Sequence, residues 1–386
     1  MNHYLYLNDN EKRILTEENL HKQLSANRIV AFRGRYKTVL VGEGLGLRYN
    51  ASIGLNSPTA YNGEVEKLLM LKKSNSCPDM MMDLSIINIK NPLYLQIEEI
   101  LGCPVGTIPY YSCFSRKKGI EKSELLDRIQ EQAENGISFL TLHLTADLDI
   151  ATQALSRTVP IISRGGSLLL WDMKLNHRKE NILLENIHDI LSICKKHGVV
   201  ISVGTTFRPS TQQDALDDVN IREINLQLKL CKWLQTQGIS TIMEGIGHIP
   251  YFRIPEYISH IRSNAYIPFM PLGPIVSDRT QGYDHITNAV GASYMAALHG
   301  ADIINAVTRE EHTGGIPSTE SFLEAVDVAK TVVKIINDSR FFSQTSSHHD
   351  CIHNCMGSPT AVGCSRCGYE CPFIWNDEAN ESAGLN

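Results

Sequence analysis

The sequence of 386 residues contains no apolar run near the roughly 18 residues that a membrane-spanning helix requires. It also has no excess of basic residues, because 36 Lys and Arg stand against 42 Asp and Glu. A basic stripe for nucleic acid or for a membrane surface is therefore not expected. The first 20 residues lack the apolar segment of a signal peptide. We expect a cytoplasmic protein that binds neither nucleic acid nor a membrane.

The spacing of a disulfide framework is also missing. Of the 10 cysteines, half are scattered through the body of the chain: Cys77, Cys103, Cys113, Cys194 and Cys231. The others are crowded beyond residue 350: Cys351, Cys355, Cys364, Cys367 and Cys371. Crowding of this kind in a cytosolic chain indicates a metal site more often than disulfides.

What the sequence does contain is an alternation of strand-like and helix-like segments. The apolar, strand-like runs are 80–87, 106–111, 138–144, 158–162, 199–205, 240–245, 265–272 and 301–307. The periodic, helix-like segments include 121–134, 176–197, 221–237, 284–299 and 319–337. About eight such units predict an α/β fold, a parallel (β/α)8 TIM-type barrel. We expect a short α+β lead-in over 1–57, the barrel over 58–338 and a cysteine-rich arm over 339–386.

Almost every expected strand ends in, or is followed by, a segment with polar or catalytic residue types. These segments are Met82-Asp83-Leu84-Ser85, Tyr110-Tyr111, His143, Ser163-Arg164-Gly165-Gly166-Ser167, Thr205-Thr206-Phe207-Arg208, Glu244-Gly245-Ile246-Gly247-His248 and Thr308-Arg309-Glu310-Glu311-His312. Any one of them alone can be a solvated loop residue. Because the carboxyl ends of barrel strands share one rim, together they predict a common site.

Three of these features have a specific chemical use. The glycines after Ser163 allow backbone N–H groups to approach an anion, and Arg164 and Arg208 can bind a phosphate; the alternative is a plain turn with a surface arginine. His248 and His312 are candidates for one metal, although two histidines do not complete a site. His143 is either a ligand, a substrate contact or a hydrogen-bonded interior histidine.

The sharpest signal is Cys364-x-x-Cys367-x-x-x-Cys371. Three thiolates leave one iron of a 4Fe-4S cluster open for a further ligand. The alternative is a zinc knuckle, with a fourth ligand from the segment that contains His348, His349, Cys351, His353 and Cys355.

Together with this triplet, several segments resemble one family. They are Asn50-Ala51-Ser52-Ile53-Gly54, Met82-Asp83-Leu84-Ser85, Gly106-Thr107-Ile108-Pro109-Tyr110-Tyr111, Ser163-Arg164-Gly165-Gly166-Ser167, Glu244-Gly245-Ile246-Gly247-His248-Ile249-Pro250, Leu272-Gly273-Pro274, Gly282-Tyr283-Asp284-His285-Ile286-Thr287 and Glu311-His312. The chain resembles the phosphomethylpyrimidine synthases of thiamine biosynthesis and the related 5-hydroxybenzimidazole synthases of anaerobic cobamide biosynthesis, which are radical S-adenosylmethionine lyases.

The resemblance implies a barrel with an iron–sulfur arm in a homodimer, with a paralogue as a further possible partner. It implies a 4Fe-4S cluster held by Cys364, Cys367 and Cys371, with S-adenosylmethionine, Zn2+ (or Fe2+) on His248 and His312, and an electron donor such as flavodoxin or ferredoxin. The implied substrate is 5-aminoimidazole ribotide. The positions that match its contacts are Met82, Tyr111, His143, Ser163, Arg164, Gly165, Thr205, Arg208 and Glu244, of which Glu244 also matches a catalytic position.

Three residues depart from the thiamine enzymes. Ser52 replaces an asparagine, Thr205 stands where those enzymes have an aspartate, and Met270 stands where they have a tyrosine. Loss of buried hydrogen-bonding groups alters selectivity. We therefore expect 5-hydroxybenzimidazole as the product, with the thiamine pyrimidine as the alternative and a non-catalytic paralogue as a third hypothesis.

The cysteine triplet yields a prediction. Anaerobic reconstitution should load an oxygen-sensitive cluster of about four irons and four sulfides per chain. Cys364→Ala, Cys367→Ala or Cys371→Ala should abolish cleavage of S-adenosylmethionine, because each removes a cluster ligand, whereas the controls Cys351→Ala and Cys355→Ala should retain most of it. Iron and sulfide analysis with a 5′-deoxyadenosine assay measures both. Full loading and turnover in Cys367→Ala would contradict the assignment.

Overall fold

The structure is a computed structural model that describes residues 5–6, 11–12, 15–263 and 266–341. The chain divides into two compact units, Met1–Arg340 and Phe341–Asn386. All of the described helices and strands belong to the first unit. The candidate cluster ligands Cys364, Cys367 and Cys371, and the expected arm that carries them, lie outside the described residues.

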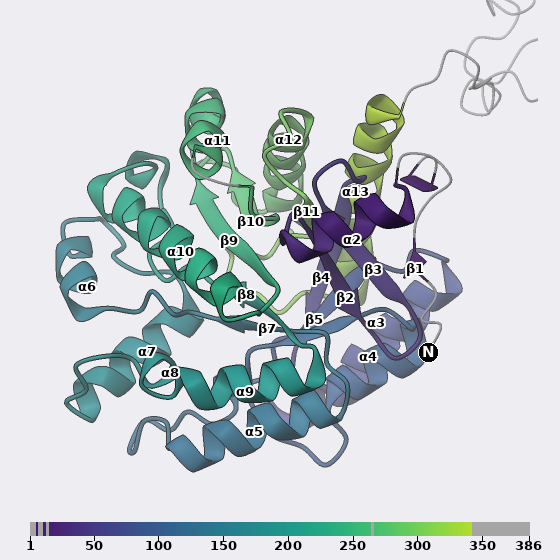
Figure 1. Ribbon diagram of the computed structural model, residues 1–386. Helices are drawn as coiled ribbons and strands as arrows, with labels where there is room; N and C mark the ends of the chain where they lie inside the picture. Colours follow the sequence, from purple (N-terminus) through teal and green to yellow (C-terminus); the bar gives the residue numbers. More distant parts are fainter. Residues whose placement is uncertain (1–4, 7–10, 13–14, 264–265, 342–386) are drawn as a thin grey trace, which may run out of the picture. The chain divides into compact units, whose positions relative to one another are not determined.

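Eight parallel strands form the core of the first unit (Figure 1). In chain order they are β4 (Arg48–Ile53), β5 (Met80–Asp83), β6 (Val105–Thr107), β7 (Phe139–Leu142), β8 (Val200–Val203), β9 (Thr241–His248), β10 (Phe269–Ile275) and β11 (Ile303–Asn305). The ladders run in the order β10-β9-β8-β7-β6-β5-β4-β11. The two end strands meet where the Asp302 N–H donates to the Phe269 carbonyl at 2.9 Å and Asn305 Nδ2 donates to the Pro271 carbonyl at 2.7 Å. The expected α/β barrel is confirmed.

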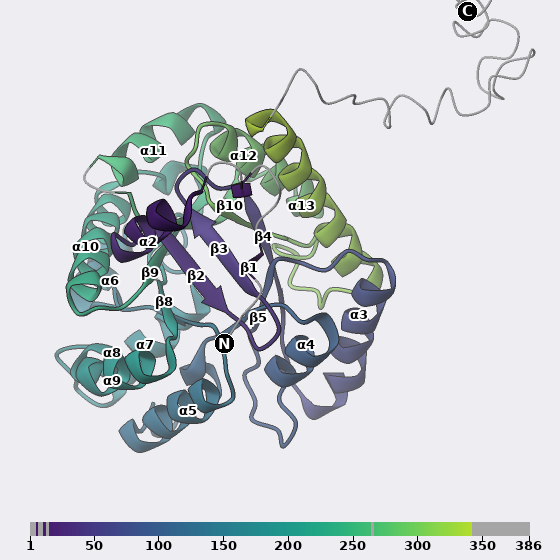
Figure 2. The same cartoon turned by 45° about the vertical axis from the view of Figure 1, so that its right-hand side comes forward.

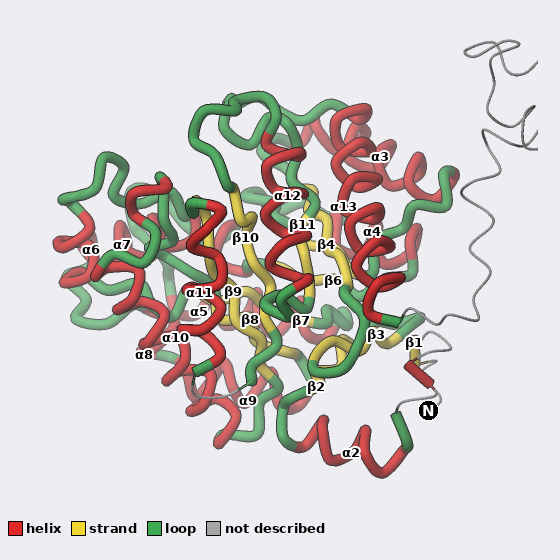
Figure 3. Tube along the Cα trace, turned by 90° about the horizontal axis from the view of Figure 1, so that it is seen from above, coloured by secondary structure: helices red, strands yellow, loops and turns green. Residues whose placement is uncertain are grey.

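Helices surround the strands, as the tube view shows (Figure 3). They are α3 (Tyr61–Lys73), α4 (Leu93–Leu101), α5 (Lys122–Glu134), α6 (Leu148–Ala154), α7 (Arg164–Leu175), α8 (Ile182–Glu185), α9 (Ile187–His197), α10 (Asp218–Thr236), α11 (Ile254–Arg262), α12 (Asp284–Ala297) and α13 (Thr319–Arg340). Their apolar stripes face the sheet: α9 buries Ile187, Ile190, Leu191 and Cys194 at helical spacing. Within the described residues, no helix has the length and apolar character needed to cross a bilayer.

A hairpin covers the amino-terminal end of the barrel. Strands β2 (Ile29–Arg33) and β3 (Thr38–Gly42) pair antiparallel, and β1 (Leu5–Tyr6) and α2 (Glu17–Ser25) flank them. Figure 2 looks onto this hairpin at the centre of the ring of helices. Phe32 packs edge-on against Phe139 at the start of β7, with ring centroids 5.3 Å apart. The Asn27 side chain bonds the backbone of Thr241, the first residue of β9. Because the hairpin covers the amino-terminal end of the barrel, a ligand site is expected at the carboxyl-terminal rim.

Two sequence-based expectations differ from the structure. The apolar run 158–162 is not a strand but part of the connection between α6 and α7, since β7 pairs directly with β8 and Pro160 lacks a backbone donor. The first barrel strand is instead β4, inside the segment expected to be a lead-in. Its alternating polar residues Arg48, Asn50 and Ser52 conceal a strand from an argument based on apolar runs.

Candidate functional site

A cavity of about 460 Å³ lies at the carboxyl-terminal rim of the barrel. Most of the expected site residues line it: Met82, Tyr111, His143, Ser163, Arg164, Arg208, Glu244, His248 and His312. They come from β5, from β9 and from the loops that follow β6, β7, β8 and β11, so segments far apart in sequence converge as predicted from the shared rim.

Glu244 lies on β9 inside the barrel and is 3% exposed. Its Oε1 accepts hydrogen bonds from Thr141 Oγ1 at 2.7 Å and from Ser202 Oγ at 2.6 Å. Burial raises the pKa of Glu244, while the two hydroxyl donors and the charge of Arg208 oppose the rise. A carboxyl group held in this way can exchange a proton with a ligand in the cavity.

His143 follows β7 and packs against the backbone of Gly165, in the first turn of α7, and of Gly204, which follows β8. Its Nδ1 lies 2.7 Å from the Tyr110 hydroxyl. A Cβ atom on Gly165 would lie 2.6 Å from the His143 ring, and one on Gly204 would lie 2.9 Å from it, so both positions require glycine. Burial, assisted by the positive charge of Arg208, lowers the pKa of His143 to about 3. The imidazole is therefore neutral at physiological pH.

The amino terminus of α7 supplies an anion-binding feature. Ser163 caps the helix, with its Oγ accepting from the Gly166 N–H at 3.1 Å. Arg164 begins the helix at the cavity, and its guanidinium lies 5.7 Å from the centroid of the Tyr111 ring. Arg208 lines the same cavity, and together with Arg164 it opposes the burial that raises the pKa of Tyr111 to about 12. A helix amino terminus with two arginines favours a phosphate or carboxylate.

His248 and His312 meet at the cavity, with their Nε2 atoms 3.0 Å apart. His248 Nδ1 lies 2.7 Å from Asp278 Oδ1, and His312 Nδ1 lies 2.8 Å from Asp284 Oδ1. Because carboxylates accept, each Nδ1–H donates, and both Nε2 lone pairs then face each other. A shared cation relieves that repulsion, and carboxylate-oriented histidines are typical metal ligands. Among the described residues, no group of three potential protein ligands for a metal is found.

Thr205 is not placed at the cavity, contrary to expectation. Its hydroxyl donates to Glu223 Oε2 at 2.6 Å, away from the lining residues. Gly165 contributes backbone behind His143 and does not line the cavity either. Met270, the third departure from the thiamine enzymes, is fully buried and also lies outside the lining. Among these departures, Ser52 is the residue that reaches the cavity.

Several residues at the site escaped the sequence argument. Thr141 and Ser202 lie within strands β7 and β8. Asn305 Oδ1 accepts a hydrogen bond from Asn50 Nδ2 at 2.7 Å across the β4–β11 pair. Asp278 and Asp284 lie in the long connection after β10 and at the start of α12. A polar residue at an interior-facing strand position is the signal that can identify the first three.

A family model described as the Radical SAM ThiC family matches residues 7–354. The phosphomethylpyrimidine synthase of Ignicoccus hospitalis is 37% identical to this chain, covering 80% of it and 73% of the relative. The phosphomethylpyrimidine synthase of Sulfolobus acidocaldarius is 28% identical and covers 96% of this chain and 94% of the relative. A dihydropteroate synthase structure from Coxiella burnetii covers 80% of this chain and 98% of its own at 10% identity, with a TM-score of 0.44, which carries no functional argument.

The carboxylate–histidine pairs yield a prediction about zinc. Asp278→Asn and Asp284→Asn should each weaken zinc binding about 10- to 100-fold, because the histidine loses the acceptor that orients it. Chelator competition on the full chain measures the affinity. Asp172→Asn is the matched control, since this buried carboxylate on α7 accepts from the Ile120 N–H at 2.8 Å. An unchanged zinc affinity in the Asp278→Asn, Asp284→Asn double variant would rule out the site.

His143 predicts a pH effect on stability. With a folded pKa of about 3, the histidine takes up a proton in the unfolded chain below pH 6.5 but not in the folded protein. The contribution of His143 to the unfolding free energy therefore falls as the pH drops from 6.5 toward 3. Between pH 7.5 and 5 the unchanged protein should lose about 2 kcal/mol more unfolding free energy than His143→Gln. Urea unfolding at both pH values measures this, and identical pH profiles would contradict it.

Proposed function

Because the chain belongs to the Radical SAM ThiC family, we propose that it forms phosphomethylpyrimidine from 5-aminoimidazole ribotide, the alternative raised by the sequence. The family assignment makes it a radical S-adenosylmethionine carbon–carbon lyase. The names of its relatives support the pyrimidine product in preference to 5-hydroxybenzimidazole.

The observation that carries this proposal is the division of the cavity into two chemically different parts. The amino terminus of α7, Arg164 and Arg208 form an anion-binding part. Glu244, His143 and Tyr111 form a part with groups that can hold or move a proton. A phosphorylated ribose carrying a basic heterocycle matches both, with its phosphate on the arginines.

Each cavity residue then has a role that its surroundings support. Neutral His143 can accept a hydrogen bond at Nε2 from a substrate hydroxyl or amine when Tyr110 accepts from its Nδ1–H. Glu244, whose pKa burial raises, can accept a proton from the heterocycle and return it. The apolar side chains of Met82, Leu84 and Ile108 exclude water from the same space.

The chain's residues fit the family's cofactors where the structure describes them. Cys364, Cys367 and Cys371 would bind the 4Fe-4S cluster, and His248 with His312 would bind zinc or iron. When bound, the cluster and S-adenosylmethionine supply the carbon radical that removes hydrogen from the substrate, and a flavodoxin- or ferredoxin-like donor supplies the electron. The facing Nε2 atoms of the histidines support the metal assignment. We propose a cytoplasmic homodimer as the working form.

A second candidate product, 5-hydroxybenzimidazole, has one observation in its favour. Ser52 lines the cavity at a position where the thiamine enzymes have asparagine. A serine is shorter, and its single hydroxyl oxygen must donate and accept where an amide has a separate NH2 donor and carbonyl acceptor, so the ring of the substrate has different partners. Thr205 and Met270 give this candidate no support, since neither side chain reaches the cavity.

The product assay tests the proposal. The full chain, loaded anaerobically with its cluster and given 5-aminoimidazole ribotide, S-adenosylmethionine and a reductant, should yield the mass of hydroxymethylpyrimidine phosphate. Thr205→Val and Met270→Leu should leave the product unchanged, because these side chains lie outside the cavity, and Met270→Leu should cost less than about 1.5 kcal/mol of stability. Formation of 5-hydroxybenzimidazole by the unchanged protein would replace the proposal with the second candidate.

A further inference from the structure

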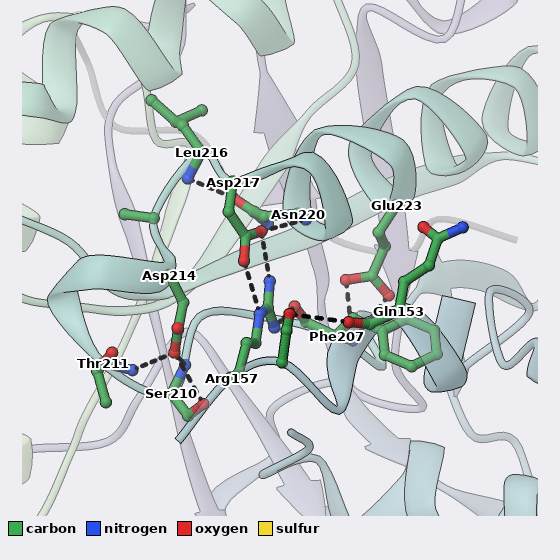
Figure 4. Close-up of polar contacts among 12 residues, drawn as sticks. Gln153, Arg157, Phe207, Ser210, Thr211, Asp214, Leu216, Asp217, Asn220 and Glu223 are labelled. Carbon is green, nitrogen blue, oxygen red and sulfur yellow. Dashed lines mark hydrogen bonds and ion pairs between the residues drawn. The ribbon is translucent and has the colours of Figure 1, made fainter. Parts of the chain in front are cut away.

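Phe207, the residue before Arg208, has its backbone N–H and its carbonyl each hydrogen-bonded to a buried charged side chain. Figure 4 shows Phe207 between Glu223, which reaches in from α10, and Arg157, which lies in the connection after α6. The Phe207 N–H donates to Glu223 Oε2 at 2.9 Å, and its carbonyl accepts from Arg157 Nη1 at 2.8 Å. We call Arg157, Phe207 and Glu223 the Phe207 clamp.

Glu223 is fully buried and accepts from four donors in the loops after β7 and β8. Oε1 accepts from the Thr206 N–H at 2.5 Å and from Thr145 Oγ1 at 2.6 Å, and Oε2 accepts from Thr205 Oγ1 at 2.6 Å. The fourth donor is the Phe207 N–H. A carboxylate can accept all four bonds at once, whereas a side-chain amide would set a donor against one of them. Glu223 therefore fixes the backbone of the turn up to Phe207.

Arg157 is fixed in turn by Asp217, the residue that caps α10 (Figure 4). The guanidinium forms two parallel bonds to that carboxylate, Nε to Oδ2 at 2.8 Å and Nη2 to Oδ1 at 2.7 Å. A forked pair of this kind sets the plane of the guanidinium and leaves Nη1 directed at the Phe207 carbonyl. Both ends of the clamp are thus tied to the first turns of α10.

Arg208 follows directly, and its side chain lines the cavity. We propose that Glu223 and Arg157 are positioning residues, which hold the Phe207 backbone so that the Arg208 guanidinium lies where the phosphate of the substrate binds. Neither residue lines the cavity, and both act through Arg208. The inference rests on the proposed function for the identity of the substrate. It also gives Thr205 a structural role, as one of the donors that Glu223 requires.

The test is a double-mutant cycle between Glu223 and Arg208. On the cluster-loaded full chain, Arg208→Ala should weaken binding of 5-aminoimidazole ribotide about 10- to 100-fold, through loss of a charge-assisted bond. Glu223→Gln should weaken it about tenfold, and the double variant should stay within about threefold of Arg208→Ala, because one contact is lost in both cases. Arg157→Lys should behave like Glu223→Gln. Titration calorimetry measures the five dissociation constants, including that of the unchanged protein.

Asp302→Asn is the matched control. This carboxylate precedes β11 at the opposite end of the barrel, where it accepts from the Phe269 N–H at 2.8 Å and pairs with Arg262 at 3.0 Å. Its loss should lower stability without changing affinity for the ribotide. Losses that multiply in the Glu223→Gln, Arg208→Ala protein, or full affinity in both Glu223→Gln and Arg157→Lys, would overturn the proposal.

A second measurement needs no substrate. Hydrogen exchange of a peptide spanning residues 203–209 should be faster in Glu223→Gln than in the unchanged protein, since the Thr206 and Phe207 amides lose a charged acceptor. Unchanged protection would overturn the clamp. If the unchanged protein fails to bind 5-aminoimidazole ribotide, the proposed function fails, while the exchange measurement still decides whether Glu223 holds the turn.

Discussion

The chemistry of the cavity depends on the buried carboxyl group of Glu244 and on the donors that its burial requires. A carboxylate taken out of water without donors costs several kcal/mol, so its neighbours must supply hydrogen bonds. Thr141 and Ser202 do so, because β7 and β8 pair Thr141 with Ser202 and β9 runs beside β8 with Val203 opposite Met243. A shift of one residue in any of these parallel pairs would turn a hydroxyl away from Glu244. The register of these barrel strands therefore determines whether Glu244 has the hydrogen-bond donors that its burial in the cavity requires.

Carboxylates outside the cavity orient, through hydrogen bonds, the groups that reach into it. Asp278 and Asp284 orient the two histidines, while Glu223 holds the turn before Arg208. Asp278 and Asp284 each accept from the Nδ1–H of a histidine whose Nε2 lies at the cavity. Glu223 accepts from the N–H of Phe207, whose neighbour Arg208 lines the cavity. The cavity thus presents arginines, imidazoles and a carboxyl group in set directions before a ligand arrives, which lowers the entropy that binding must overcome.

The departures from the thiamine enzymes change meaning once the side chains are placed. Thr205 and Met270 suggest altered contacts with the reacting ring when only the sequence is considered, and this suggestion favoured 5-hydroxybenzimidazole. In the structure Thr205 bonds Glu223, and Met270 is buried outside the cavity. Thr205 turns its hydroxyl to Glu223 behind the loop. Met270 is the register partner of Glu244 and shares its face of the sheet, yet it does not line the cavity. Ser52 remains as the departure that a substrate can meet.

The sequence by itself determined the alternation of strands and helices, and it predicted the rim at which the cavity lies and most of the expected residues that line it, because strand ends and helix caps are local signals. It also marked Ser163 and Arg164 at a turn that became the amino terminus of α7. It misplaced one strand at 158–162 and missed β4, since apolar content does not reveal pairing partners. The sequence analysis already grouped His248 with His312 as candidates for one metal. Only the tertiary structure decided that their Nε2 atoms lie 3.0 Å apart, that Asp278 and Asp284 stand behind them, and that Glu223 holds Phe207. These contacts join residues whose meeting depends on strand register and barrel closure, which arise from long-range packing rather than from local sequence.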